Sequence, residues 1–167
     1  MSALPGRRQG VGLLGWFALC FVAAGIGALA SVDAAAFYAR LAQPAWAPPA
    51  AVFGPVWTTL YALMAIAAWL VWRRAGWRDA HRALSLFVIQ LAVNALWSWL
   101  FFVWHLGAPA FVGTLALWGL IAATLIAFWR KSRLAGVLLV PYLAWVSLAT
   151  ALTWAVWQAN PGLLGLA

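Results

Sequence analysis

The amino-acid sequence predicts an all-α integral membrane protein that folds as a single bundle of five transmembrane helices. Of its 167 residues, 68% are hydrophobic and only 7% are charged, which is more apolar surface than a soluble domain of this size can bury. The apolar residues form five runs, each long enough to cross the hydrocarbon core, which needs about 20 helical residues. We expect the helices near 11–32, 51–72, 83–105, 109–129 and 134–157, within one domain that spans residues 1–167.

The first of these runs follows Arg7 and Arg8, so it could be mistaken for a secretory signal peptide. At about 22 residues it is longer than the usual signal core of roughly 7–15 apolar residues, and it carries no convincing cleavage site. We therefore interpret it as a spanning helix. Cys20 is the only cysteine of the chain, which excludes an intramolecular disulfide and a cysteine metal cluster.

The net charge of +8 is unevenly distributed along the chain. Nine of the ten basic residues fall in three segments that share one side of the membrane if there are five spans, whereas Arg40 falls on the other. The nine are Arg7, Arg8, Arg73, Arg74, Arg78, Arg82, Arg130, Lys131 and Arg133. This positive-inside pattern predicts a cytoplasmic N-terminus and an outside C-terminus. It indicates orientation and not binding of nucleic acid, and continuous apolar helices favour a bacterial inner membrane over an outer one.

A proline-rich segment, QPAWAPPA at 43–50, separates the first two runs. Pro44, Pro48 and Pro49 fix φ and lack an N–H, so this segment cannot be regular helix, although Pro49 suits the first turn of the helix that follows. Trp46 lies within the loop. The loop is either a lid that holds this ring over the mouth of the bundle, or an interfacial segment that Trp46 anchors at headgroup level.

Three of the predicted helices each have a face with a distinct set of side chains, spaced at about 100° per residue. The three stripes are Trp57, Tyr61, Met64 and Ala68 on the second helix, Gln90, Asn94, Trp97, Phe101 and His105 on the third, and Tyr142, Trp145, Ala149 and Thr153 on the fifth. Polar groups should face the bundle interior, because an unsatisfied one is costly in hydrocarbon. The stripes therefore predict a cavity with aromatic walls, suited to a large, flat, mostly apolar ligand.

The polar residues of these stripes have a second interpretation. Gln90 and Asn94 could hydrogen bond across the bundle; we favour this role for Gln90 and leave both roles open for Asn94. His105 sits at a helix end, where we expect an interfacial residue, with axial ligation of haem as the alternative. Asp33 and Asp79 are the only acids and lie in loops, so we expect no proton-coupled, hydrolytic or metal-dependent site within the spans.

Several motifs follow one another in order along the chain. They are Pro44-x-Trp46-x-Pro48-Pro49, Phe53-Gly54-Pro55-Val56-Trp57, Leu60-Tyr61, Gln90-Leu91-x-x-Asn94-x-x-Trp97, Phe101-Phe102, Val140-Pro141-Tyr142-Leu143-x-Trp145 and Ala149-Thr150. Together they resemble the TspO/MBR family, the tryptophan-rich sensory proteins of bacteria related to the mitochondrial translocator protein (peripheral benzodiazepine receptor). The similarity covers nearly all of the chain, and the order of the motifs makes it specific.

The resemblance implies a five-helix bundle, often dimeric, with a ligand pocket under the first long loop. It also implies binding of porphyrins or other haem-pathway tetrapyrroles, of sterols in some lineages, and of isoquinoline-carboxamide or benzodiazepine ligands. The implied pocket positions, with those from the stripes and the loop, are Trp46, Pro48, Pro49, Trp57, Tyr61, Asn94, Trp97, Phe101, Tyr142, Trp145 and Ala149. Thr153 departs from the family, in which Asn is common at this position. The cholesterol-associated pattern of an apolar residue, Tyr and then Lys or Arg is missing from the end of the last helix, which mildly disfavours binding of a sterol.

We therefore expect a membrane receptor or transporter-like protein that binds porphyrin or a related tetrapyrrole in an aromatic pocket under the prolyl loop. The alternative is light-dependent breakdown of protoporphyrin, in which Trp57 and Trp145 act as the reactive residues. A further alternative is a structural membrane subunit whose pocket holds lipid. The expected partners are a flat apolar ligand, the lipid bilayer and a second copy of the chain, and we expect no cofactor and no metal.

Overall fold

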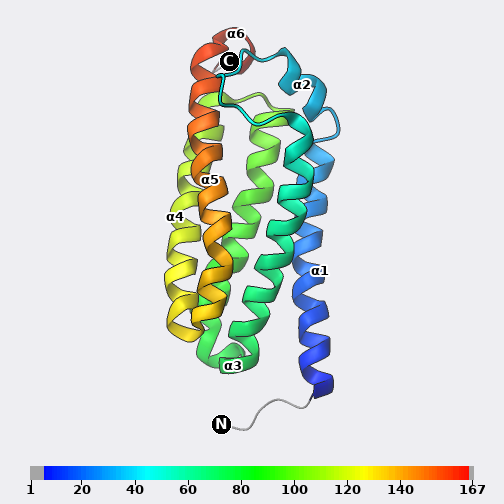
Figure 1. The fold of residues 1–167 in the computed structure, drawn as a ribbon, viewed down its shortest axis with the longest axis vertical. Helices are drawn as coiled ribbons and strands as arrows, with labels where there is room; N and C mark the ends of the chain where they lie inside the picture. Colours follow the sequence, from blue (N-terminus) through cyan, green and yellow to red (C-terminus); the bar gives the residue numbers. More distant parts are fainter. Residues whose placement is uncertain (1–5, 166–167) are drawn as a thin grey trace.

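The computed structural model describes residues 6–165, in which the regular secondary structure is helical. The elements are α1 (Gly6–Ala30), α2 (Ala34–Arg40), α3 (Ala50–Ser98), the π-helical turn η1 (Trp99–Val103), α4 (Gly107–Lys131), α5 (Arg133–Ala159) and α6 (Pro161–Leu164). The long helices lie side by side along one axis, and the short helices α2 and α6 lie together at one end of the bundle (Figure 1).

Helix α3 consists of two legs that meet at Gly76. The backbone there has φ 67° and ψ 177°, a non-helical conformation that glycine adopts without a Cβ penalty. Residues 50–75 form the first leg and residues 77–98 the second, and the chain folds back between them (Figure 1). The loop expected at 73–82 is therefore helical apart from this one residue, because its Ala and Arg residues are good helix formers.

Four helices of the described chain are long and apolar enough to cross a membrane: Arg8–Ala30, Ala50–Val103, Gly107–Lys131 and Arg133–Ala159. The second of these is 54 residues long and contains both legs of α3 together with η1. The prediction of an all-α membrane bundle is confirmed. The prediction of five separate spans holds only in part, because the second and third expected spans belong to one helical segment that reverses at Gly76.

The expected loop before α3 begins with helix α2, which the sequence analysis did not predict. Its AAAFYAR sequence is rich in alanine and free of proline, and it buries Phe37 and Tyr38. The segment at 41–49 is non-helical, as its three prolines require. Pro49 is the N-cap residue of α3, one position before the first turn in which we expected it.

Side chains of α3 contact α1 near the end of the bundle where α3 reverses. A Cβ atom on Gly12 would overlap the ring of Trp72, so only glycine fits at this crossing. One turn earlier, Trp69 donates a hydrogen bond from Nε1 to the carbonyl oxygen of Gln9 at 2.9 Å. These contacts hold α1 against the first leg of α3 at this end of the bundle.

The basic side chains concentrate at that same end. Helix α1 begins there, α3 reverses there, and α4 is joined to α5 there, whereas α2 with Arg40 lies at the opposite end (Figure 1). The described basic residues at the reversal end are all exposed: Arg8, Arg73, Arg74, Arg78, Arg82, Arg130, Lys131 and Arg133. The side chain of Arg7 lies outside the described part of the chain. The fold thus gives the bundle one strongly basic end.

Candidate ligand-binding site

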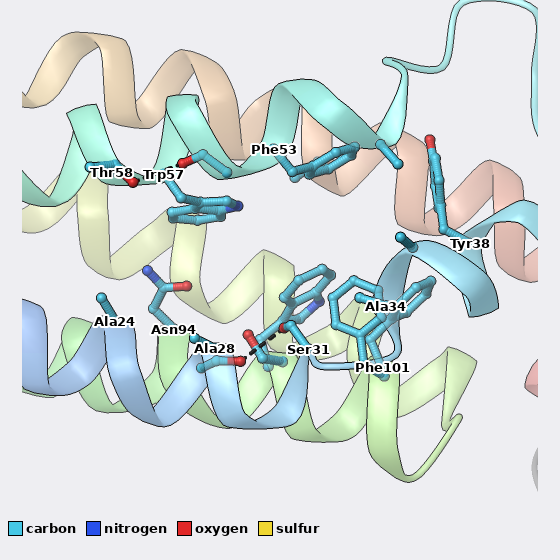
Figure 2. Close-up of a pocket in the computed structure, with 18 of the residues that line it drawn as sticks. Ala24, Ala28, Ser31, Ala34, Tyr38, Phe53, Trp57, Thr58, Asn94 and Phe101 are labelled. Carbon is cyan, nitrogen blue, oxygen red and sulfur yellow. Dashed lines mark hydrogen bonds between the residues drawn. The ribbon is translucent and has the colours of Figure 1, made fainter.

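A cavity of about 580 Å³ extends from α2 into the bundle (Figure 2). Four long segments and α2 contribute to its walls, with the second leg of α3 continuing into η1. The lining residues are Phe21, Ala24, Gly25, Gly27, Ala28, Ser31, Ala34, Ala35, Tyr38, Ala50, Phe53, Gly54, Trp57, Thr58, Tyr61, Asn94, Trp97, Ser98, Phe101, Phe102, Ala149, Leu152, Thr153 and Val156.

Aromatic rings form two walls of this cavity. Phe53, Trp57 and Tyr61 follow one another at four-residue spacing on the first leg of α3, which places them on one face of the helix. Trp97 and Phe101 have the same spacing across the junction of α3 with η1, and their rings stack with centroids 5.4 Å apart and an interplanar angle of 11°. The cavity therefore lies between two ladders of flat side chains.

Helix α1 provides a wall of small residues. Ala24, Gly25 and Ala28 face the cavity, and Gly27 is so close to the second leg of α3 that an added Cβ would lie 3.3 Å from Oγ of Ser98. Side chains of this size cannot fill the space between α1 and the aromatic residues opposite. The small residues of α1 are thus a direct cause of the cavity's volume.

The cavity opens sideways between α1 and the first leg of α3. Gly25 and Ala28 on α1 line it and are exposed, as are Gly54 and Thr58 on the facing helix. Both helices belong to the candidate membrane spans, so this opening faces the region that lipid occupies. We expect a ligand dissolved in the bilayer to enter the cavity through this opening.

A buried polar network joins the two legs of α3 to α5. The hydroxyl of Tyr142 donates to Oε1 of Gln90 at 2.8 Å, and Nδ2 of Asn94 donates to the hydroxyl oxygens of Tyr142 at 3.0 Å and of Tyr61 at 3.3 Å. Gln90 also directs Nε2 toward Sδ of Met64 at 3.7 Å. Gln90 therefore has the interhelical role that we favoured, and Asn94 both bonds across the bundle and lines the cavity.

Of the predicted site residues, six line the cavity. They are Trp57, Tyr61, Asn94, Trp97, Phe101 and Ala149. Tyr142 lies behind Asn94 and is fully buried. Trp145 lines a separate, more open groove between the first leg of α3 and α5, together with Pro55 and Pro141. Periodicity placed both residues on the correct helix but could not show which neighbouring side chains stand between them and the cavity.

The predicted residues of the prolyl loop also lie outside the cavity lining. Trp46 is 50% exposed, and Pro49 is exposed as well. The backbone oxygen of Pro48 accepts a hydrogen bond from the hydroxyl of Tyr38 at 3.2 Å. Burial raises the pKa of the Tyr38 phenol, so this donor keeps its proton at neutral pH. The element in contact with this end of the cavity is therefore α2, and a ligand-binding role for the three loop residues stays a prediction.

The sequence analysis missed the contribution of α1 and α2 to the site. Its only available signal was the set of small residues on α1, which in a membrane helix indicates close packing as readily as a cavity. His105 does not line the cavity; its backbone has φ 53° and its ring lies 4.2 Å from that of Phe37. Among the described residues there is no group of three His, Cys, Asp or Glu side chains that could hold a metal ion.

The fold and the site together define a multi-pass integral membrane protein with an aromatic cavity inside its helical bundle. Residues 16–158 match the model of the TspO/MBR family, and the chain belongs to this family. It is 42% identical to the translocator protein of Homo sapiens over 131 residues, which cover 77% of this chain and 78% of that protein.

Two bacterial relatives match over a longer part of the chain. Protein CrtK of Rhodobacter capsulatus is 38% identical over 148 residues, which cover 88% of this chain and 91% of that protein. The tryptophan-rich sensory protein of Cereibacter sphaeroides is 39% identical over 147 residues, which cover 88% and 90%.

Proposed function

We propose that this protein binds a tetrapyrrole, with porphyrin as the first candidate, and that it acts as a membrane receptor or transporter for this ligand. The observation that carries the proposal is the cavity itself. Its volume of about 580 Å³ lies within the roughly 300–1,000 Å³ typical of small-molecule sites. Trp57, Trp97 and Phe101 offer flat surfaces on which a macrocycle can stack, at a gain beyond simple burial of area.

The chemistry of the lining supports a largely apolar ligand. Asn94, Thr58, Ser31 and Thr153 supply neutral polar groups, and the lining contains no Asp, Glu, Lys or Arg. A charged group of the ligand would therefore have to remain at the mouth, near the lateral opening. The relatives named translocator protein and tryptophan-rich sensory protein are consistent with transport and with sensing, and a cavity alone serves either role.

We also propose that the basic end of the bundle faces the cytoplasm of a bacterium and that the protein resides in the inner membrane. The exposed basic residues at the reversal end of α3 support this orientation through the positive-inside rule. Helices α2 and α6 would then lie outside, together with the end of the cavity that α2 covers. Association of two copies, which the family resemblance implies, is part of the same proposal.

Titration of the protein in lipid nanodiscs with protoporphyrin in darkness tests the proposed binding. Saturable quenching of tryptophan fluorescence, absent from empty nanodiscs mixed with free tryptophan, is the expected result. Quenching that rises linearly with porphyrin and never saturates would reject the proposal, and it would favour a structural subunit whose cavity is filled by lipid.

Light-dependent breakdown of protoporphyrin is the second candidate function. The position of Trp57 favours it, because this indole lines the cavity and would contact a bound macrocycle. An excited porphyrin held against an indole can oxidise it, directly or through oxygen, without an acid, a base or a metal. The sequence also suggested Trp145 as a reactive residue, but this role has less support, since Trp145 lines a different groove.

A further inference from the structure

Asn94 presents an unpaired hydrogen-bond acceptor to the cavity. Both hydrogens of its Nδ2 are used, one on the hydroxyl oxygen of Tyr61 and one on that of Tyr142. Within the described residues no hydrogen bond reaches its Oδ1. The side chain is only 3% exposed and lines the cavity, and Figure 2 shows its amide oxygen on the side of the cavity interior.

The orientation of this amide follows from a chain of hydrogen bonds that begins at Met64. A thioether sulfur only accepts, so the amide nitrogen of Gln90 faces Sδ of Met64 and Oε1 of Gln90 faces Tyr142. The single hydroxyl proton of Tyr142 is then committed to Gln90. The Tyr142 oxygen must therefore accept from its other neighbour, so Asn94 turns its NH₂ group toward Tyr142 and its oxygen away from it.

We propose that Met64, Gln90 and Tyr142 hold Asn94 with its carbonyl oxygen in the cavity, and that the cavity selects ligands that present an N–H or O–H donor to this oxygen. Gln90 and Tyr142 act as positioning residues, since they affect the ligand through Asn94. The inference rests on the proposed function in one respect, that the cavity holds a ligand, and it adds the hydrogen-bonding class of that ligand.

The physical basis is the cost of an unpaired polar group. A buried acceptor that a bound ligand covers without a hydrogen bond loses its solvation with no compensation, and sites built around such a group discriminate strongly against ligands that cannot pair with it. A flat ring with an N–H at its edge pairs with Oδ1 and still stacks between Trp57 and Trp97. In a porphyrin the pyrrole N–H groups point to the centre of the macrocycle, so the donor at its edge has to be a peripheral group such as a protonated carboxylic acid.

Three flat tricyclic probes of similar size separate the possibilities. Carbazole carries an N–H donor, fluorene carries neither a donor nor an acceptor, and fluorenone carries a carbonyl acceptor at the equivalent position. We expect the parent protein in nanodiscs to bind carbazole about 2- to 10-fold more tightly than fluorene, the gain of one net hydrogen bond, and fluorenone no more tightly than fluorene. Ratios of Kd are compared between variants, so that differences in lipid partitioning cancel.

Variants along the chain of hydrogen bonds test the relay. Asn94→Leu should reduce the preference for carbazole over fluorene, measured as the ratio of their Kd values, to the value that lipid partitioning alone gives. Gln90→Leu frees the Tyr142 proton to bond Oδ1 of Asn94, which turns the NH₂ group into the cavity, so the preference should pass from carbazole to fluorenone. Tyr142→Phe is the alternative variant if Gln90→Leu does not fold. It is a smaller change at the same point, and it should reduce the carbazole preference. Thr124→Val is the matched control: Thr124 is buried, its hydroxyl bonds the Leu120 carbonyl oxygen at 2.7 Å and it does not line the cavity, so the ratios should not change.

A purely structural role for these residues would weaken all three probes equally, and that result would overturn the proposal. So would a carbazole preference that survives in Asn94→Leu or that persists unchanged in both Gln90→Leu and Tyr142→Phe, or a parent protein that binds no probe. The two proposals fail separately. Saturable porphyrin binding without a carbazole preference rejects the donor selection alone, and a carbazole preference without porphyrin binding rejects the tetrapyrrole alone.

Discussion

The ring of Phe53 packs edge-on against the ring of Trp145, with centroids 5.6 Å apart and an interplanar angle of 73°. Phe53 lines the cavity and Trp145 does not. The two tryptophans that the sequence had suggested as a reactive pair, Trp57 and Trp145, therefore line different hollows. Only Trp57 is in a position to contact a ligand held in the cavity.

The contact leads to an expectation about light-dependent chemistry. If the protein breaks down protoporphyrin, Trp57→Phe should slow the reaction sharply, whereas Trp145→Phe should leave it close to the parent rate, because electron loss from an indole to an excited porphyrin favours direct contact. Both substitutions keep a ring at the site, so binding should change little. The measurement is the decay of the porphyrin absorption band under illumination with oxygen, with a dark control. Equal slowing by both variants would contradict the expected order.

Trp97 should contribute strongly to porphyrin affinity. Trp97→Ala removes a ring that stacks on Phe101 and lines the cavity, so we expect a loss of on the order of 1–3 kcal/mol in binding free energy. Fluorescence-quenching titrations measure the loss. Trp77→Ala is the control, because Trp77 is 51% exposed beside the reversal at Gly76, far from the cavity. Trp72, although it is also near that end, is unsuitable because its ring packs against Gly12. A similar loss in Trp97→Ala and Trp77→Ala would indicate destabilisation of the bundle.

The lateral opening should control the rate of ligand entry. Gly54 lines the opening, is exposed, and has no atom within 4 Å of the position that a Cβ would occupy. Gly54→Phe should therefore be tolerated by the fold, place a ring across the gap between α1 and α3, and slow association of porphyrin supplied from the bilayer. Stopped-flow quenching measures this rate. Gly119→Phe, at an equally open and exposed position on α4, should leave the rate at the parent value. If Gly54→Phe also leaves it there, the ligand enters by another route.

The orientation in the membrane can be tested by labelling intact bacteria with an impermeant maleimide. Cys20 is fully buried and is first replaced by serine. Single cysteines are then placed at His81, beside the reversal of α3, and at Ala45, in the prolyl loop; both positions are exposed. We expect the variant Ala45→Cys to be labelled and His81→Cys to be labelled only after the membrane is permeabilised. The opposite pattern would reverse the proposed orientation.

The sequence by itself determined the class of the protein, the approximate positions of its long helices and the aromatic residues of α3 that line the cavity. These properties follow from composition and from the 3.6-residue period, which are local. Trp57, Asn94 and Trp97 could be assigned to the interior because a polar group at membrane depth must face other protein groups. The basic end could be identified for a similar reason, since charge distribution along the chain is visible without coordinates.

The tertiary structure decided what depends on distances between helices. The reversal at Gly76 requires a backbone conformation that no pattern of side chains specifies, and the cavity exists because small residues on α1 face large ones on α3. Trp145 packs against Phe53 of the neighbouring helix and lines a separate groove, an arrangement that depends on how the two helices meet. The free oxygen of Asn94 depends on side chains from three helical segments, the two legs of α3 and α5, whose hydrogen bonds run in one direction because Met64 can accept and cannot donate.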